Sequence, residues 1–367
     1  MKLFQCQCCG QILYFENTVC LRCGNVLGYL PDEDRMLAVQ AEGPVWRALP
    51  DLQVGRRESP DPGPLRFCRN WERSACNWMQ ASDGVGQAGF CLACQHNRTV
   101  PDLSTPEHVA LWTKMEAAKR RLMYSVLRLN LPRPLPGSGH SEPLVFDFLA
   151  DDKVNPDPVL TGHSDGIITI ALIEADDAAR EQRRSQMGEA YRTLLGHFRH
   201  EVGHYYWDML VRDGDALDAC RDLFGDERAD YADAMQQHYK MGAPEGWETR
   251  FVSAYATMHP WEDWAETWAH YLHMIDTLET AGAMGLQMDA GTDFEVHHPV
   301  DPYQSTDAAQ LIGTWVPLTL ALNSLNRSMG QSDLYPFSLP AAVQAKLGFV
   351  HDLVSRCRVE PKSPSSV

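Results

Sequence analysis

The stretch RTLLGHFRHEVGH, residues 192–204, ends in the pattern His-Glu-x-x-His. His200 and His204 are four residues apart, so on a helix their imidazoles lie on one face, one turn apart. Two histidines at this separation can bind one zinc ion. Glu201 lies beside them, where its carboxylate could deprotonate a metal-activated water without being a ligand. The pattern also arises by chance, so its interpretation depends on the surrounding residues.

The flanking residues are typical of a helix. Apolar side chains recur at helical spacing in one stripe, formed by Leu194, Leu195, Phe198, Val202, Tyr205 and Met209. A polar stripe runs beside it and contains His197, Glu201, His204 and Asp208. Asp208 and His197 have two interpretations: each either orients a ligand imidazole or is a plain surface residue.

A catalytic zinc ion needs a third protein ligand, and a segment downstream offers candidates. Residues 255–270, YATMHPWEDWAETWAH, place Glu262 and Glu266 one helical turn apart beside an apolar stripe rich in tryptophan. Two buried carboxylates at this spacing require a compensating cation, which a zinc ion with its imidazoles would provide. The alternative is that both carboxylates face solvent. Asp263 and Asp226 are weaker candidates for the ligand.

These two segments resemble the gluzincin arrangement, in particular the zincins of the lethal-factor type. Residues 192–200, residues 259–266 and the N-terminal cysteines together resemble a bacterial family of zinc-binding metallopeptidases that carry an N-terminal zinc ribbon. The resemblance covers about residues 1–350. It implies that Glu262 is the third zinc ligand and that Tyr255 helps to stabilise the oxyanion of the transition state. It also implies that Glu266 orients a ligand. Because Asp263 directly follows Glu262, the phase of the helix decides which carboxylate faces the metal, and Glu266 remains an alternative.

Nine of the eleven cysteines precede residue 95 and form two groups. The first group comprises Cys6, Cys9, Cys20 and Cys23. The second comprises Cys68, Cys76, Cys91 and Cys94. The spacing of the first group is typical of a structural zinc site with four thiolate ligands, and a glycine follows each of its pairs. The second group is a further four-cysteine candidate, whose first pair, Cys68 and Cys76, is more widely spaced. Buried free thiols or a redox pair are the alternatives, and Cys8 is the odd thiol of the first group.

The charge and composition limit the classes of partner. The net charge of −17 disfavours binding to nucleic acids and to anionic membranes. No apolar run reaches the length of a membrane span, and the N-terminus lacks the apolar segment of a signal peptide. We therefore expect a cytoplasmic, reducing location, in which the cysteines bind metal and do not form disulfides.

The order of elements predicts an α+β fold. Strands are expected at 144–149 and 166–172, the latter being either a core strand or a sheet edge that binds an extended peptide. Helices are expected at the following positions: 106–129, 176–212, from Pro260 onward, 305–325 and 339–356. Residues 54–64 look like a linker.

We divide the chain into three parts. Residues 1–103 form a zinc-ribbon module, and residues 104–350 form a zincin-like catalytic domain. Residues 351–367 form a flexible tail that overlaps the end of the last helix.

The sequence therefore predicts a zinc-dependent peptidase with one catalytic and two structural zinc ions and with Glu201 as general base. Its expected partner is a peptide or protein substrate, and no nucleic acid or membrane is expected. The alternative is a zinc-ribbon adaptor or scaffold that retains an inactive hydrolase fold.

Overall fold

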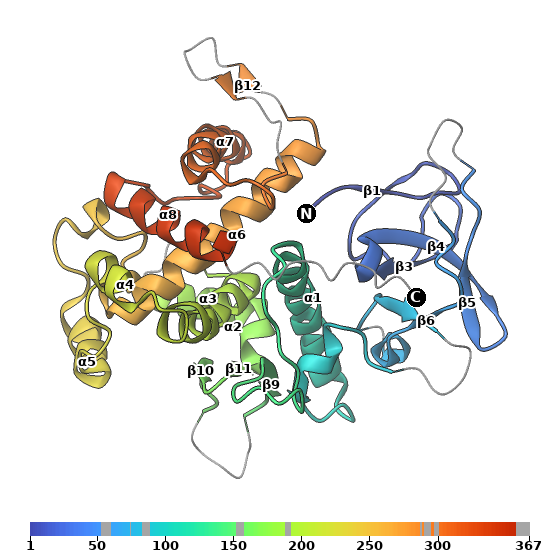
Figure 1. Cartoon of the computed structure of the whole chain (residues 1–367), viewed down its shortest axis with the longest axis horizontal. Coiled ribbons are helices and arrows are strands. Elements are labelled where there is room, and N and C mark those ends of the chain that lie inside the picture. Colours follow the sequence, from blue (N-terminus) through green and yellow to red (C-terminus); the bar gives the residue numbers. More distant parts are fainter. Residues whose placement is uncertain are drawn as a thin grey trace.

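The computed structural model describes residues 1–52, 60–73, 75–82, 89–151, 158–187, 192–286, 288–289, 295–296 and 301–356. It is a mixed α/β structure, with a four-cysteine, zinc-ribbon-like module at the N-terminus and a larger domain of helices and strands after it. Figure 1 shows α1 (Pro106–Arg128) between the N-terminal strands and the other helices.

The N-terminal module contains more regular structure than the sequence predicts. A short hairpin of β1 (Phe4–Gln5) and β2 (Ile12–Leu13) carries the first cysteine pair. An antiparallel sheet of five strands follows, formed by β3 (Val26–Leu30), β4 (Arg35–Glu42), β5 (Val45–Ala48), β6 (Leu65–Phe67) and β7 (Met79–Ala81). The expected linker 54–64 connects two adjacent strands of this sheet, β5 and β6, and its residues 54–59 lie outside the described residues.

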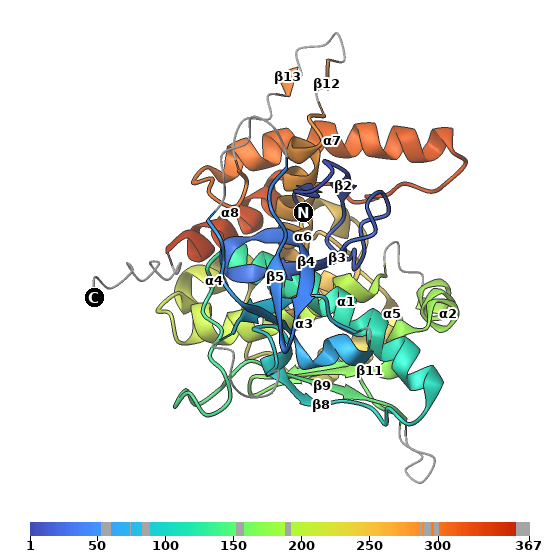
Figure 2. The same cartoon turned by 90° about the vertical axis from the view of Figure 1, so that its right-hand side faces the viewer.

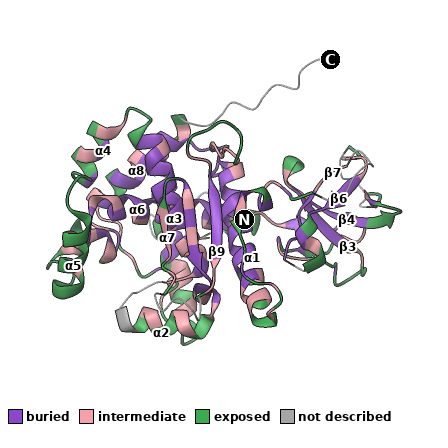
Figure 3. Cartoon of the chain, turned by 90° about the horizontal axis from the view of Figure 1, so that it is seen from below, coloured by how far each residue is buried: buried purple, intermediate pink, exposed green. Residues whose placement is uncertain are grey.

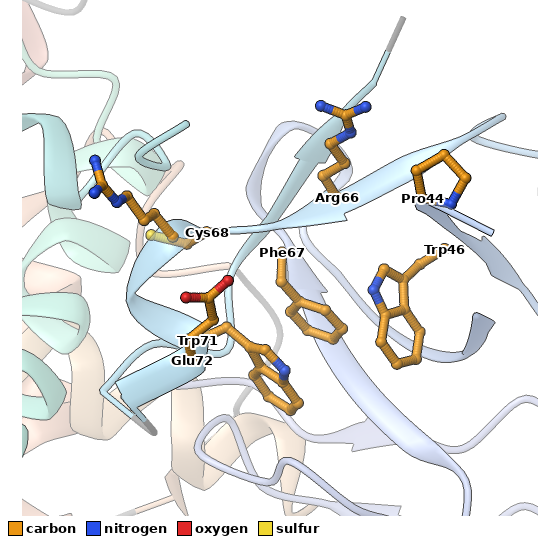
Figure 4. A pocket seen from close by; sticks show the side chains of 8 residues that line it. Pro44, Trp46, Arg66, Phe67, Cys68, Trp71 and Glu72 are labelled. Atoms are coloured by element: carbon orange, nitrogen blue, oxygen red, sulfur yellow. The ribbon is translucent and has the colours of Figure 1, made fainter. Parts of the chain in front are cut away.

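Aromatic side chains line a hollow on this sheet (Figure 4). Trp46 packs edge-on against Phe67, with ring centroids 5.1 Å apart. Phe67 in turn stacks on Trp71 at 4.0 Å. This small cluster gives the sheet a second apolar layer, on the side away from α1.

The second sheet has four strands and lies in the larger domain. It comprises β8 (Asn97–Thr99), β9 (Val145–Leu149), β10 (Gly162–Ser164) and β11 (Ile167–Ala171), in the order β10-β11-β9-β8. Figure 2 shows β8, β9 and β11 side by side. The two predicted strands are confirmed. The edge role considered for residues 167–172 is wrong, because β11 is paired on both sides and β10 forms that edge.

Within the described residues, seven further helices follow α1. They are α2 (Asp177–Met187), α3 (Leu194–Trp207), α4 (Leu217–Phe224), α5 (Tyr231–Met241), α6 (Pro260–Ala283), α7 (Ala308–Ser328) and α8 (Ala341–Arg356). The short strands β12 (Met288–Asp289) and β13 (Glu295–Val296) pair before α7. Among the helices of the described chain, none combines the length and apolar character that a membrane crossing requires.

Two predicted boundaries need correction. The continuous helix expected over 176–212 is divided, because Thr193 begins α3 as an N-cap whose hydroxyl accepts a hydrogen bond from the Gly196 amide at 3.0 Å. A π-helical turn at Asp208–Arg212 then ends the segment. The expected tail 351–367 begins too early, since α8 continues to Arg356; residues 357–367 lie outside the described residues.

One apolar core runs through both parts of the molecule. It includes Phe15 and Tyr29 of the N-terminal module and Tyr124 of α1, whose ring centroid lies 5.5 Å from that of Phe15. It continues through α3 and α6, which lie in the buried interior (Figure 3). The two parts therefore pack together, and α1 contacts both of them.

Candidate active site and metal centres

The close contact between α3 and α6 depends on Gly203. A Cβ atom at this position would lie 3.1 Å from Cα of Ala265 and 3.2 Å from Cβ of Trp268. The indole N–H of Trp264 also donates a hydrogen bond of 2.8 Å to the carbonyl oxygen of Gly203. Because the helices approach so closely, the His-Glu-x-x-His face of α3 meets the acidic first turn of α6.

Three side chains converge at this contact. Nε2 of His200 lies 2.9 Å from Oε2 of Glu262, and Nε2 of His204 lies 3.5 Å from Oε1 of the same carboxylate. Their potential ligand atoms all lie within 4.8 Å of one another. Two imidazoles and one carboxylate are a donor set that catalytic zinc sites use. The arrangement is able to hold one metal ion.

Glu266 contacts the other side of the His200 ring. Its Oε1 lies 2.7 Å from Nδ1 of His200, and its Oε2 accepts a 2.5 Å hydrogen bond from the Ser253 hydroxyl. Glu262 and Glu266 thus approach opposite nitrogens of one imidazole. The geometry favours Glu262 as the third ligand and Glu266 as the carboxylate that orients His200.

The two weaker ligand candidates lie elsewhere. Asp263 is fully buried and pairs with the ammonium group of Lys346 at 2.6 Å. Asp226 pairs with Arg228 at 2.7 Å on the surface. The phase of α6 therefore turns Asp263 away from the histidines.

Burial and charge set the electrostatics of the cluster. Burial raises the pKa of Glu201; His200 and His204 oppose this effect, and the neighbouring carboxylates Glu262 and Glu266 add to it. Burial alone would raise the pKa of Glu262, but His204 and His200 outweigh it and hold that pKa well below its usual range. Burial would lower the pKa of His200, but hydrogen bonds to the two carboxylates hold it well above its usual range. Glu201 is therefore the most basic carboxylate of the three.

Two tyrosines border the cluster. Tyr255, in a 3-10 turn at Tyr255–Thr257, has its ring centroid 6.0 Å from that of His200, and burial followed by the charge of Glu262 raises its pKa. Tyr231, the first residue of α5, donates a hydrogen bond of 2.9 Å from its hydroxyl to Oε1 of Glu262. Tyr231 belongs to neither sequence motif, so nothing in the local sequence indicated its place here.

His163, on the edge strand β10, is a second residue that the sequence did not reveal. Its side chain is buried, and its ring centroid lies 6.4 Å from that of His204. Asp208 lies 4.0 Å from Nδ1 of His163 and 3.1 Å from Arg212. Within the described residues no hydrogen bond reaches Nδ1 of His204, so Asp208 does not orient it directly.

His197 lies away from the ligands. Its Nε2 is 3.8 Å from Oε2 of Glu174, in the 3-10 turn Leu172–Ala175 that follows β11. The polar residues of α3 therefore point to two places: His204 lies in the candidate metal cluster, whereas His197 contacts Glu174.

The first cysteine group forms a compact cluster. Sγ of Cys6 lies 3.7 Å from Sγ of Cys23, and Sγ of Cys9 lies 3.6 Å from Sγ of Cys20. Gly10, after the first pair, has a φ of 74°, a backbone conformation that side chains disfavour. None of the described cysteines forms a disulfide, and the four potential ligands fit one tetrahedral zinc ion.

The second cysteine group is fully buried against α1. Sγ of Cys76 lies 3.7 Å from Sγ of Cys91, and Sγ of Cys94 lies 3.5 Å from a carboxylate oxygen of Glu116. Glu116 pairs with the buried ammonium group of Lys119 at 2.9 Å. A cation of α1 therefore compensates the negative charge gathered at this cluster.

Comparison with known proteins identifies the class. Residues 108–353 match a family model described as "Putative zinc-binding metallo-peptidase", and residues 3–105 match a zinc-ribbon domain. The chain belongs to this metallopeptidase family and carries the zinc ribbon at its N-terminus, which confirms the resemblance seen in the sequence. Zinc is the metal that both matches indicate.

The relatives extend over nearly the whole chain. Uncharacterised proteins of Mycobacterium bovis and of two Mycobacterium tuberculosis strains are 41% identical to it over 355 residues. The aligned region spans 96% of this chain and 95% of each relative. No solved structure matches the chain.

Proposed function

We propose that this protein is a zinc-dependent peptidase of the gluzincin type, with Glu201 as the general base. The observation that carries the proposal is the convergence of His200, His204 and Glu262 within 4.8 Å, with Glu201 buried beside them.

The residues present fit a zinc ion. Glu201, Glu262 and Glu266 lie in one largely buried cluster, and three such carboxylates require compensating positive charge. Three protein ligands also leave one position open, as in catalytic sites. Zinc bound here would lower the pKa of a water molecule toward ~7 and polarise the carbonyl of the cleaved bond.

The side chains of the protein have three further roles, which are proton transfer, orientation of a ligand and stabilisation of the oxyanion. Glu201 accepts the proton of the attacking water and returns it to the leaving amine, a task that its raised pKa suits. Glu266 holds the imidazole of His200 in its ligand orientation. The hydroxyl of Tyr255 donates to the developing oxyanion, and that of Tyr231 borders the same site.

The two cysteine clusters are proposed to bind one structural zinc ion each, so the protein binds three zinc ions in total. Thiolates around a closed tetrahedral site contribute folding energy, which a small module needs. The partner is a peptide or protein, since the net charge of −17 disfavours nucleic acid.

The test compares the wild-type protein with Glu201→Gln on a library of peptides, with the zinc content of both measured. We expect the substitution to lower kcat by about 10²–10⁴-fold while three zinc ions remain bound. Glu248→Gln, which changes an exposed carboxylate, is the control and should leave cleavage unchanged. Equal cleavage by wild type and Glu201→Gln, or no cleavage by fully zinc-loaded wild type, would contradict the proposal and favour a scaffold.

A further inference from the structure

Helix α5 lies at the outer edge of the molecule and carries an apolar stripe with no core beneath it. None of its eleven residues is buried, and Figure 3 shows it largely in green. Tyr231, Met235 and Tyr239 are spaced four residues apart, so they share one face. They are 37%, 38% and 61% exposed. In an ordinary surface helix such a stripe packs against the core.

This face is turned toward the candidate active site. At one end, the hydroxyl of Tyr231 bonds to Glu262 at 2.9 Å. One residue before Tyr239, His238 lies on the same face, and its ring centroid is 6.0 Å from that of Tyr255. Tyr231 therefore contacts the candidate metal cluster, and His238, near the other end of the helix, lies beside Tyr255.

Met235 lies between these two anchors. Four helical residues advance the chain by about 6 Å, so Met235 lies one turn beyond Tyr231 on the same face. Met235 is 38% exposed, although Tyr231 and His238 on either side of it contact residues of the site. An apolar surface is thus continuous with the proposed catalytic residues.

We propose that α5 forms part of the substrate-binding surface beside the candidate metal cluster and selects peptides with a large apolar side chain next to the cleaved bond. This inference rests on the proposed peptidase function. A methionine side chain adapts its shape to varied apolar partners, and a tyrosine ring offers a flat apolar face with little entropy to lose. The stripe therefore accommodates substrate side chains of different shape, such as leucine, methionine and phenylalanine.

Charge excludes one class of residue from this position. Asp230 caps α5 and Asp233 lies in its first turn, so the start of the helix is acidic. The protein as a whole carries a net charge of −17. A glutamate or aspartate next to the cleaved bond is repelled here, whereas a neutral apolar side chain is not.

The experiment uses a series of peptides that differ only in the residues on either side of the cleaved bond, which are alanine, leucine, phenylalanine or glutamate. Zinc-loaded wild type should cleave the leucine and phenylalanine peptides roughly 10–200-fold more efficiently than the alanine peptide, and the glutamate peptide least. Met235→Ser should reduce this preference several-fold, because the rates on the leucine and phenylalanine peptides should fall more than the rate on the alanine peptide.

Met241→Ser is the matched control, because Met241 lies on the same helix, is 78% exposed and projects to a different side from Met235. It should keep the wild-type preference. Equal cleavage of all four peptides by the wild type, or an unchanged preference in Met235→Ser, would overturn the role of α5 and leave the peptidase function intact.

Binding to Glu201→Gln separates this inference from the proposed function. Fluorescence anisotropy with the same labelled peptides should show tighter binding of the leucine and phenylalanine peptides, and Met235→Ser in this background should weaken it. If this preference is found but wild type cleaves nothing, α5 is supported as a peptide-binding surface and the peptidase proposal fails. If no peptide binds or is cleaved, both proposals fail.

Discussion

Glu262 and Glu266 are chemically identical and one helical turn apart, yet they contact opposite nitrogens of His200. Side chains four residues apart on α6 lie on one face, and the imidazole of His200 lies across that face. Glu266 is held in place by the hydroxyl of Ser253, and Glu262 by that of Tyr231. Each carboxylate therefore has its own hydroxyl partner, which holds it against a different nitrogen of His200.

Zinc affinity should distinguish these roles. Glu266→Gln should weaken zinc binding at the catalytic site about 10–100-fold, because an orienting partner of His200 is changed. Glu262→Gln should weaken it considerably more, because the proposed third ligand is lost. Competition with a chromophoric chelator measures both, with Glu248→Gln as the surface control. If Glu266→Gln caused the larger loss, Glu266 would be the ligand and the present assignment would be wrong.

Among the elements, the α3–α6 pair positions the site, and Gly203 allows its close approach. In Gly203→Ala the new Cβ would press on Cα of Ala265, an atom that does not move alone. Overpacking of this kind costs about 1–3 kcal/mol, which exceeds the gain of about 1 kcal/mol in helix propensity. We expect lower stability in urea denaturation and weaker zinc binding at the catalytic site.

Gly282→Ala is the matched control on α6. A Cβ at Gly282 meets nothing within 4 Å, so the helix propensity gain should appear without a packing penalty. The free energy of unfolding should be equal to or slightly above that of the wild type. If Gly203→Ala behaved in the same way, the close contact between α3 and α6 would not control the site.

Glu174, in the turn that follows β11, forms ion pairs with an arginine of α2 and with one that precedes α3. It is buried and pairs with Arg183 and, at 3.1 Å, with Arg192. Burial alone would raise its pKa, but His197, Arg192 and Arg183 outweigh it and hold the pKa below its ordinary value of 4.5. The stability that this carboxylate contributes is therefore present above about pH 4.5 and is lost as the pH falls through its lower folded-state pKa.

Glu174→Gln should lower the free energy of unfolding at pH 7 by roughly 1.5–3 kcal/mol, because a charged acceptor of hydrogen bonds is lost. The difference from the wild type should shrink as the pH falls from 5 to 3, which thermal melts across this range can follow. Glu181→Gln, which breaks an exposed pair with Arg184, should have almost no effect. A difference that is constant with pH would refute the charge-based explanation.

On the scale of the whole molecule, the two parts of the chain share one core across α1. Phe15 and Tyr29 pack on Tyr124, and the second cysteine cluster contacts Glu116 of the same helix. An apolar core that crosses the module boundary couples the stability of both sides. Loss of the second cysteine cluster should therefore also lower the stability of the larger part of the chain that follows it.

Cys76→Ser should lower the zinc content from the proposed three ions to two per chain and lower the melting temperature of the whole protein in a single transition. Cys8→Ser is the matched control, because the thiol of Cys8 lies near the carbonyl of Pro50, outside both cysteine clusters. It should keep three zinc ions and the wild-type melting temperature. Two separate transitions in Cys76→Ser would show that the parts fold independently.

Features that depend on neighbours along the chain could be predicted from the sequence. The His-Glu-x-x-His face needs only helical periodicity, and each Cys-x-x-Cys pair needs only a short turn, so their residue types and spacing were sufficient. The strands β9 and β11 and the helices α1 and α6 followed from periodicity in the same way. The five-stranded sheet of the N-terminal module was missed, because its strands lack a long alternating pattern of apolar and polar residues.

Contacts between distant segments were decided by tertiary packing alone. The hydrogen bond of Tyr231 joins residues 31 positions apart, and His163 approaches His204 from an edge strand. The orientation of Asp263 toward Lys346 was likewise set by how α6 packs on α8. Periodicity shows which residues share a face of a helix, but the angle and distance at which two helices pack determine what that face meets.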